Sequence, residues 1–131
     1  MDPAKVLEIT HDLFLASDIL VDDIKEDMRE KMKDGQYDKL AKFFIYKLII
    51  EINEYPIYDK IRPEIVRSGL YMAMLIDIYG FNDPINVKKF ANLMYKFFKY
   101  LWENKLNIRL DKERWELLET KLSELYLLIQ K

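Results

Sequence analysis

The sequence contains few side chains that could carry out chemistry, and its single histidine is the first of them. Glu8 and His11 are three positions apart, so on a helix they project from the same side, as the metal ligands of di-iron helical bundles do. Those sites need two such motifs and two further carboxylates, and one histidine supplies only one motif unless a dimer brings two copies together. We therefore predict no metal site, and we expect His11 at the surface or half-buried in a helix.

Nucleophilic catalysis and phosphate binding are equally hard to build from this composition. The chain has no cysteine and only three glycines, which removes thiolate chemistry, iron–sulfur clusters and glycine-rich phosphate loops. With one histidine, no Ser–His–Asp arrangement can be identified either. The sequence predicts no enzyme activity, no catalytic residue and no cofactor.

The densest charged segment is acidic. Asp18, Asp22 and Glu26 step by four residues, so three carboxylates would line one side of a helix. That pattern could hold a divalent cation or act as paired acid and base groups. It is also typical of a solvated helix face that nearby basic residues partly neutralise, and this is the interpretation we adopt. A metal-dependent enzyme centred on these carboxylates with Glu8 and His11 is the weakest functional hypothesis.

Helix start and stop signals divide the chain into about five helices. Asp2, Asp83 and Asp111 stand at N-cap positions, and a proline follows the first two. Gly35 is placed to end a helix in the left-handed conformation, and Gly80 is placed to end another helix. The fold class is therefore all-α, and the predicted helices span residues 3–33, 38–54, 60–79, 84–105 and 111–130.

Length and composition favour one domain over residues 1–131. Half of the residues are hydrophobic and the formal net charge is −2, which excludes intrinsic disorder and a polycation that coats nucleic acid by charge alone. No apolar run approaches the roughly 20 residues that span a bilayer, and acidic residues interrupt the start where a signal peptide would be apolar. We expect a soluble helical bundle, located in the cell or in a virion.

The third predicted helix is nearly all apolar from Gly69 to Ile76. A helix that is apolar all round is usually buried, so we expect the third and fourth helices at the centre of the bundle. Glycine within a helix costs on the order of 1 kcal/mol relative to alanine. We expect Gly69 to offset that cost by letting a neighbouring helix approach closely.

Charge is distributed unevenly along the chain. Residues 1–34 hold 10 acidic and 5 basic side chains, a net charge of −5, whereas residues 83–110 hold 2 acidic and 6 basic side chains, a net charge of +4. A molecule with one acidic and one basic region can attract further copies of itself. We therefore expect a homo-oligomer or membership of a larger protein assembly.

The last two predicted helices supply the candidate interface. Large apolar rings flank a narrow lysine ridge on the helix 84–105, and they exceed what one neighbouring helix covers. On the helix 111–130 the apolar residues step by three and four, the spacing of a helix–helix seam. A core helix whose lysines reach outward is the alternative. The candidate interface residues are Tyr95, Phe98, Tyr100, Trp102, Trp115, Leu118, Leu122 and Leu125.

The lysine ridge also fits a nucleic-acid surface, with ammonium groups on phosphates and rings available for stacking. Few arginines and a modest positive charge make this the second hypothesis. Its candidate contacts are Lys88, Lys89, Lys96, Lys99, Lys105 and Arg109.

In overall character the chain resembles the small all-helical structural proteins of viruses that infect hyperthermophilic archaea. The resemblance rests on length, the absence of cysteine, and helices rich in Lys, Ile, Tyr and Phe, such as residues 42–50 and 96–102. It spans the whole chain and carries no signature residue. It implies a virion building block without enzymatic activity.

A second resemblance is to the small helical subunit of type III CRISPR effector complexes, which lines nucleic acid along a protein filament. Phe90, Met94 and Tyr100 and the stretch 65–71 are similar to segments of that family. The acidic first helix and the last helix depart from its pattern, so no functional residue is transferred. This resemblance implies a subunit that binds a nucleic-acid backbone.

Overall fold

The computed structural model describes residues 1–19, 25–105 and 108–131. Over these residues it contains helices and no strand, so the all-α class is confirmed, with six α-helices in place of the predicted five or so. The helices are α1 (Pro3–Ala16), α2 (Lys25–Lys33), α3 (Tyr37–Glu54), α4 (Arg62–Tyr79), α5 (Pro84–Glu103) and α6 (Lys112–Gln130), with the short 3-10 helix η1 (Pro56–Tyr58) before α4.

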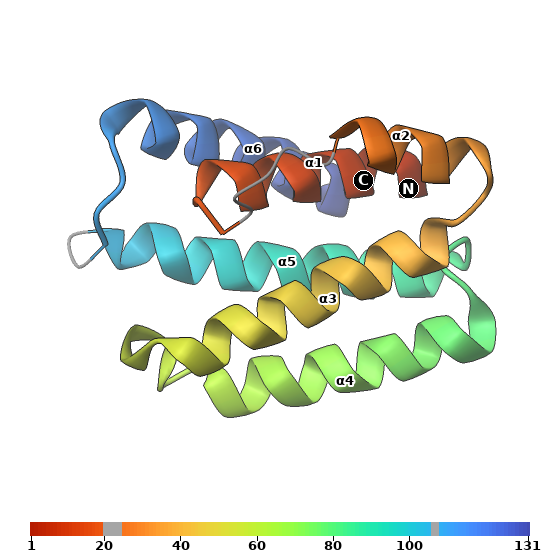
Figure 1. The fold of residues 1–131 in the computed structure, drawn as a ribbon, viewed down its shortest axis with the longest axis horizontal. Coiled ribbons are helices and arrows are strands. Elements are labelled where there is room, and N and C mark those ends of the chain that lie inside the picture. Colours follow the sequence, from red (N-terminus) through yellow and green to blue (C-terminus); the bar gives the residue numbers. More distant parts are fainter. Residues whose placement is uncertain (20–24, 106–107) are drawn as a thin grey trace.

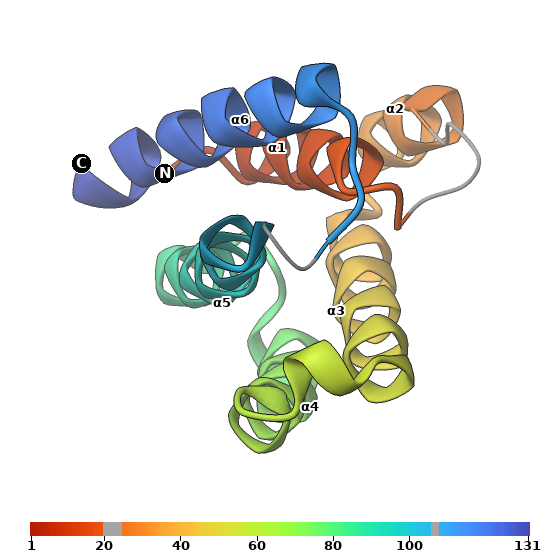
Figure 2. The ribbon, with the colours of Figure 1, turned by 90° about the vertical axis from the view of Figure 1, so that its left-hand side faces the viewer.

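The helices stack in three layers (Figures 1 and 2). Helices α1 and α6 lie side by side in one outer layer, with α2 beside them. The middle layer holds α3 and α5, and α4 forms the other outer layer against both of them. Because α5 packs against α1, α4 and α6, it is the central helix of the bundle.

The aspartates that the sequence marks as N-caps do cap their helices. The Asp2 carboxylate accepts the N–H of Ala4 at 3.0 Å. Asp83 accepts two backbone N–H groups of α5, and Asp111 accepts the N–H of Arg114 at 2.9 Å. Each carboxylate satisfies N–H groups that have no partner within the helix. The helix ends are confirmed in the same way, because Gly35 and Gly80 both have positive φ.

The prediction of one helix over residues 3–33 is wrong. Helix α1 ends at Ala16, and α2 begins at Lys25. Two features stop α1: the Ser17 hydroxyl donates to the carbonyl of Leu13 at 2.9 Å, and Asp18 adopts φ 62°, in the left-handed region. Residues 20–24 lie outside the described residues. The prediction that Asp22 and Asp23 lie on a helix therefore falls outside the described part of the chain.

The expectation that residues 60–79 form a central, most buried helix is also wrong. Helix α4 buries Ile65, Gly69, Met72, Ala73 and Ile76 on one side only, while large apolar residues on its other side remain exposed. Apolar character all round a helix leads to full burial only where neighbours surround it. Two helices, α3 and α5, cover one side of α4.

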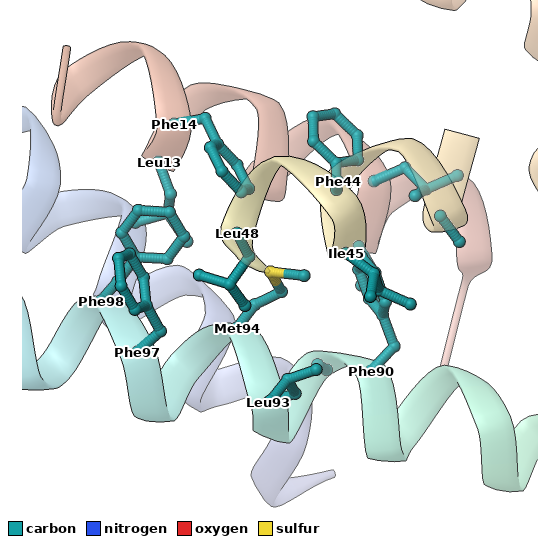
Figure 3. Packing of buried hydrophobic residues seen from close by; sticks show 14 of the residues in the cluster. Leu13, Phe14, Phe44, Ile45, Leu48, Phe90, Leu93, Met94, Phe97 and Phe98 are labelled. Atoms are coloured by element: carbon teal, nitrogen blue, oxygen red, sulfur yellow. The ribbon is translucent and has the colours of Figure 1, made fainter. Parts of the chain in front are cut away.

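An aromatic cluster joins α1 to the two helices of the middle layer, α3 and α5. Phe14 of α1 stacks on Phe44 of α3, with ring centroids 5.3 Å apart, and meets Phe98 of α5 edge-on at 5.1 Å. Figure 3 shows these rings converging between the three helices. All three side chains are fully buried, and edge-on aromatic pairs contribute beyond the burial of their area. The core therefore lies between α1, α3 and α5.

Helices α3 and α4 approach closely at Gly69, as the sequence predicts. A Cβ atom added at Gly69 would lie 3.2 Å from Cδ1 of Ile49 and 3.3 Å from Cγ2 of Ile45. These distances are shorter than ordinary van der Waals contacts, so the two helices are as close as a missing side chain allows.

We expect Gly69→Val to lower the free energy of unfolding by about 1–3 kcal/mol, because its methyl groups force Ile45 and Ile49 away. Ser68→Val is the matched control, since Ser68 is the exposed neighbour on the same helix, and it should change stability by about 0.5 kcal/mol or less. Urea unfolding followed by circular dichroism measures both. Equal effects of the two substitutions would contradict the close contact.

Candidate protein-interaction surface

Half of the predicted interface residues lie in the core. Phe98, Leu118, Leu122 and Leu125 are buried, in the layers where α6 packs on α1 and α5. The spacing of three and four does mark a helix–helix seam, but the neighbouring helices belong to the same chain. Phe98, Leu118 and Leu125 are fully enclosed by the chain, whereas Leu122 lies in the wall of a groove between α5 and α6.

The other four predicted interface residues, Tyr95, Tyr100, Trp102 and Trp115, are half-buried. The Tyr100 hydroxyl donates to the carbonyl of Ile57 at 2.9 Å, and the rings of Trp102 and Trp115 meet edge-on with centroids 5.9 Å apart. Tyr95 and Trp102 also line a groove of about 640 Å³ between α5 and α6. Their rings are largely used within the chain, and the groove is the part that remains open.

A larger group of exposed apolar side chains lies on the opposite side of the molecule, on α4. Leu70, Tyr71, Met74 and Ile78 are 47–62 % exposed. Tyr71, Met74 and Ile78 step by three and four residues and Leu70 stands four before Met74, so all four lie on one side of the helix, opposite the side that packs on α3 and α5. Exposed apolar side chains that gather in one place mark interaction sites, whereas scattered ones do not.

Helix α3 extends this surface. Lys42, Tyr46 and Ile50 step by four residues and so share one side of α3. The Lys42 ammonium lies 2.6 Å from the Asp77 carboxylate of α4, which brings that side of α3 next to α4. Tyr46 and Ile50 are exposed. We use the name apolar face for the six exposed residues of the two helices: Tyr46, Ile50, Leu70, Tyr71, Met74 and Ile78.

Charged groups border the apolar face. Arg67 stands one turn before Tyr71 and is exposed, and no ion pair joins it to another of the described residues. Asp77 stands near the other end, paired with Lys42, with its side chain 58 % exposed. The hydrogen bond from Lys42 to Asp77 raises the pKa of the Lys42 ammonium, and the nearby negative charge acts in the same direction. The face thus has Arg67 at one end and the Lys42–Asp77 ion pair at the other.

On its α5 side, the apolar face lies next to the exposed lysines of α5. The Lys89 ammonium lies 5.8 Å from the centre of the Tyr71 ring, and Lys96 forms an ion pair with Glu64. A groove of about 290 Å³ runs here between α4 and α5, with Ser68 in its wall.

All six candidate nucleic-acid contacts are exposed, as a backbone-binding surface requires. Several of their cations are nevertheless engaged within the chain. Lys99 lies 3.9 Å from Glu103, and the Lys105 ammonium lies 3.8 Å from the centre of the Trp102 ring. With Lys89 over Tyr71 and Lys96 beside Glu64, fewer free charges remain for phosphates than the sequence alone indicates.

Among the residues that it describes, the structure does not bring the candidate metal ligands together. His11 is buried, with Nδ1 3.2 Å from an Asp12 oxygen, so the expectation of a surface or half-buried histidine is wrong. Glu8 is exposed, Asp18 follows the end of α1 and Glu26 belongs to α2. Within the described ranges no group of three His, Cys, Asp or Glu side chains is placed to hold a metal ion.

None of the helices in the described part of the chain combines the length and the apolar run that a membrane crossing requires. This agrees with the absence of a spanning segment that the sequence predicts.

A half-buried acid, Glu51, lies at the C-terminal end of α3. Glu51 and Tyr58 line a pocket of about 440 Å³, with Arg109 also in its wall. Burial raises the pKa of the Glu51 carboxyl above its ordinary value of 4.5, the Glu54 charge adds to this, and a hydrogen bond with Tyr58 opposes it. Burial and the nearby Glu51 also raise the pKa of the Tyr58 hydroxyl.

This shift gives stability a predictable pH dependence. Because the folded-state pKa of Glu51 is raised, the folded protein holds that proton more tightly, and stability falls as the pH rises from about 4.5 through the folded-state pKa. Glu51→Gln should therefore be more stable than the parent chain at pH 7, and the difference should vanish near pH 4. Urea unfolding across this range measures it.

Glu119→Gln, at an exposed carboxylate of α6, is the control and should change stability by about 0.5 kcal/mol or less at each pH. A Glu51→Gln chain that is less stable than the parent at pH 7 would contradict the raised pKa.

Comparison with known proteins adds no relative: no protein-family model, curated protein or solved structure matches this chain. The resemblances to viral structural proteins and to a CRISPR subunit therefore remain predictions.

The apolar face is not among the interface residues that the sequence predicts. The apolar run from Gly69 to Ile76 predicts a helix buried on all sides, although a helix that is apolar all round fits either a surrounded position or an outer helix with an external partner. The charged residues at both ends of the run, Arg67 and Asp77, were the signal for an exposed side.

Proposed function

We propose that the protein is a structural or assembly protein, without catalytic activity, that acts by burying its apolar face against another protein molecule. The observation that carries this proposal is the exposed set of large apolar residues on α4 and α3. The uneven charge distribution and the composition typical of virion proteins support an associating protein.

The size of the apolar face supports association. Six large side chains that are about half exposed leave several hundred Å² of apolar area, and burying it at about 25 cal/mol per Å² contributes on the order of 10 kcal/mol. Association costs about 4–15 kcal/mol in lost freedom of motion. The apolar term is of the same order as the cost, so polar contacts at the edges decide the affinity.

Two matched substitutions test where association occurs. Leu70 on α4 and Leu127 on α6 are both exposed leucines of helices, at 53 % and 61 %. We expect Leu70→Asp to abolish association, because it places a charge in the centre of the buried surface. Leu127→Asp should associate like the parent chain. Sedimentation velocity over a range of concentrations measures association, and circular dichroism confirms that each variant folds.

The reverse result would place the contact at the groove between α5 and α6 and contradict the proposed surface. A photo-crosslinking residue at Met74, introduced into the protein in its source cells, supplies the second measurement. A parent chain that stays monomeric at every concentration and forms no crosslink from Met74 would overturn the proposed function.

A second candidate function is binding of a nucleic-acid backbone, favoured by the exposed row of lysines along α5. Such binding weakens as salt rises, because phosphate contacts release counterions. Lys88→Glu with Lys99→Glu should then lower the affinity for a labelled single-stranded RNA at least about tenfold. Fluorescence anisotropy at several salt concentrations measures both effects.

The control for this test is Lys5→Glu with Lys39→Glu. These exposed lysines of α1 and α3 produce the same change in net charge away from α5. Equal losses in the two double variants, or an affinity that ignores salt, would contradict a binding site on α5.

A further inference from the structure

The outer side of α4 has the spacing of a two-helix seam. Arg67, Tyr71, Met74 and Ile78 step by four, three and four residues, and Leu70, Met74 and Asp77 step by four and three. Side chains at these intervals interdigitate with those of a second helix laid along the same side. The seam has apolar residues at its centre, Arg67 towards one end, and Asp77, which is paired with Lys42, towards the other.

The charges lie at nearly equal distances from the centre of the seam. The midpoint falls between Tyr71 and Met74, and at about 1.5 Å per residue Arg67 lies about 8 Å before it and Asp77 about 7 Å after it. When the seam is turned end over end, Arg67 therefore falls at the level along the helix that Asp77 occupied. A surface with this property is complementary to itself.

From this we infer that the occupant of the apolar face is a second copy of this chain, with the two α4 helices antiparallel about a twofold axis between Tyr71 and Met74. The inference rests on the proposed function, and names its partner. In a twofold contact each pairing occurs twice. Tyr71 of each copy meets Met74 of the other, and Arg67 of each copy lies beside Asp77 and Ile78 of the other.

Electrostatics select the antiparallel arrangement. Arg67 forms no ion pair with another of the described residues, and the half-exposed Asp77 carboxylate can accept a second cation besides Lys42. A parallel pair would instead set Arg67 against Arg67, and like charges placed together at an interface are costly. Only the antiparallel pair gives both arginines a carboxylate.

The area agrees with a contact between two copies. A standard interface buries about 800 Å² of each partner. The six residues of the apolar face supply several hundred Å² of apolar surface per copy, and Arg67, Asp77 and the neighbouring polar groups of α4 supply a rim, the usual anatomy of such an interface.

Two charge reversals test this arrangement. We expect Arg67→Asp alone and Asp77→Arg alone to weaken self-association at least about tenfold, because each creates two like-charge contacts across the twofold axis. An equimolar mixture of the two variants should associate again as a mixed dimer, because every charge then faces its opposite. Native mass spectrometry distinguishes the mixed dimer by mass from the homodimers of the two single variants.

Recovery in the mixture separates the inference from damage to the fold, since two misfolded chains would not repair each other. Asp77→Arg also removes the ion pair with Lys42, so thermal unfolding of each variant is measured alongside. Asp77→Asn, which lacks the reversed charge, should weaken association less than Asp77→Arg.

The outcomes distinguish this inference from the proposed function. Association that Leu70→Asp abolishes but that the charge reversals leave unchanged would overturn the antiparallel pair and keep the apolar face as an interface. A monomeric parent chain whose Met74 crosslinks to a different protein would overturn the second copy as occupant and keep the assembly role. A monomeric chain without a crosslink would overturn both.

Discussion

The close contact between α3 and α4 at Gly69 determines how the rest of the molecule meets its surroundings. Because no side chain separates the helices there, α4 is held with Gly69, Met72 and Ala73 facing inward. A helix has only one rotation about its axis that satisfies this contact. Leu70, Tyr71 and Met74 are then turned outward, although their side chains are largely apolar. The exposed face is thus a consequence of internal packing.

The three-layer arrangement explains why that face stays uncovered. The central position belongs to α5, whose Phe90, Phe97 and Phe98 are fully buried between α1, α4 and α6. A chain of 131 residues buries about two-thirds of the surface of its extended form. In the described part of the chain α4 packs on α3 and α5, so its outer side is left exposed.

Helix starts and ends depend on local residues, and the sequence predicts most of them. The position of each helix in the bundle depends on residues far apart in the sequence, and it is predicted poorly. Asp83 and Asp111 mark helix starts because a short carboxylate satisfies free N–H groups wherever they occur, and Gly80 marks an end because few other residues adopt its φ. The break after Ala16 depends on the conformation of Asp18, which composition does not reveal. Which of two apolar helices lies at the centre is decided by all the other helices together. The sequence pattern therefore predicts a surface position for Phe98 and Leu118 and a core position for Leu70, and both predictions are wrong.

The symmetry inferred for the pair connects the two candidate functions. Helix α5 lies along one side of α4, where Lys89 reaches the Tyr71 ring and Lys96 reaches Glu64. A twofold axis that lies in the contact plane, perpendicular to α4, leaves that side unchanged, so both α5 helices would fall on the same side of the pair. Their lysine rows would then form one longer basic surface, with more phosphate contacts than one chain offers. Binding of a nucleic-acid backbone would depend on association, and a substitution in the centre of the apolar face would weaken both.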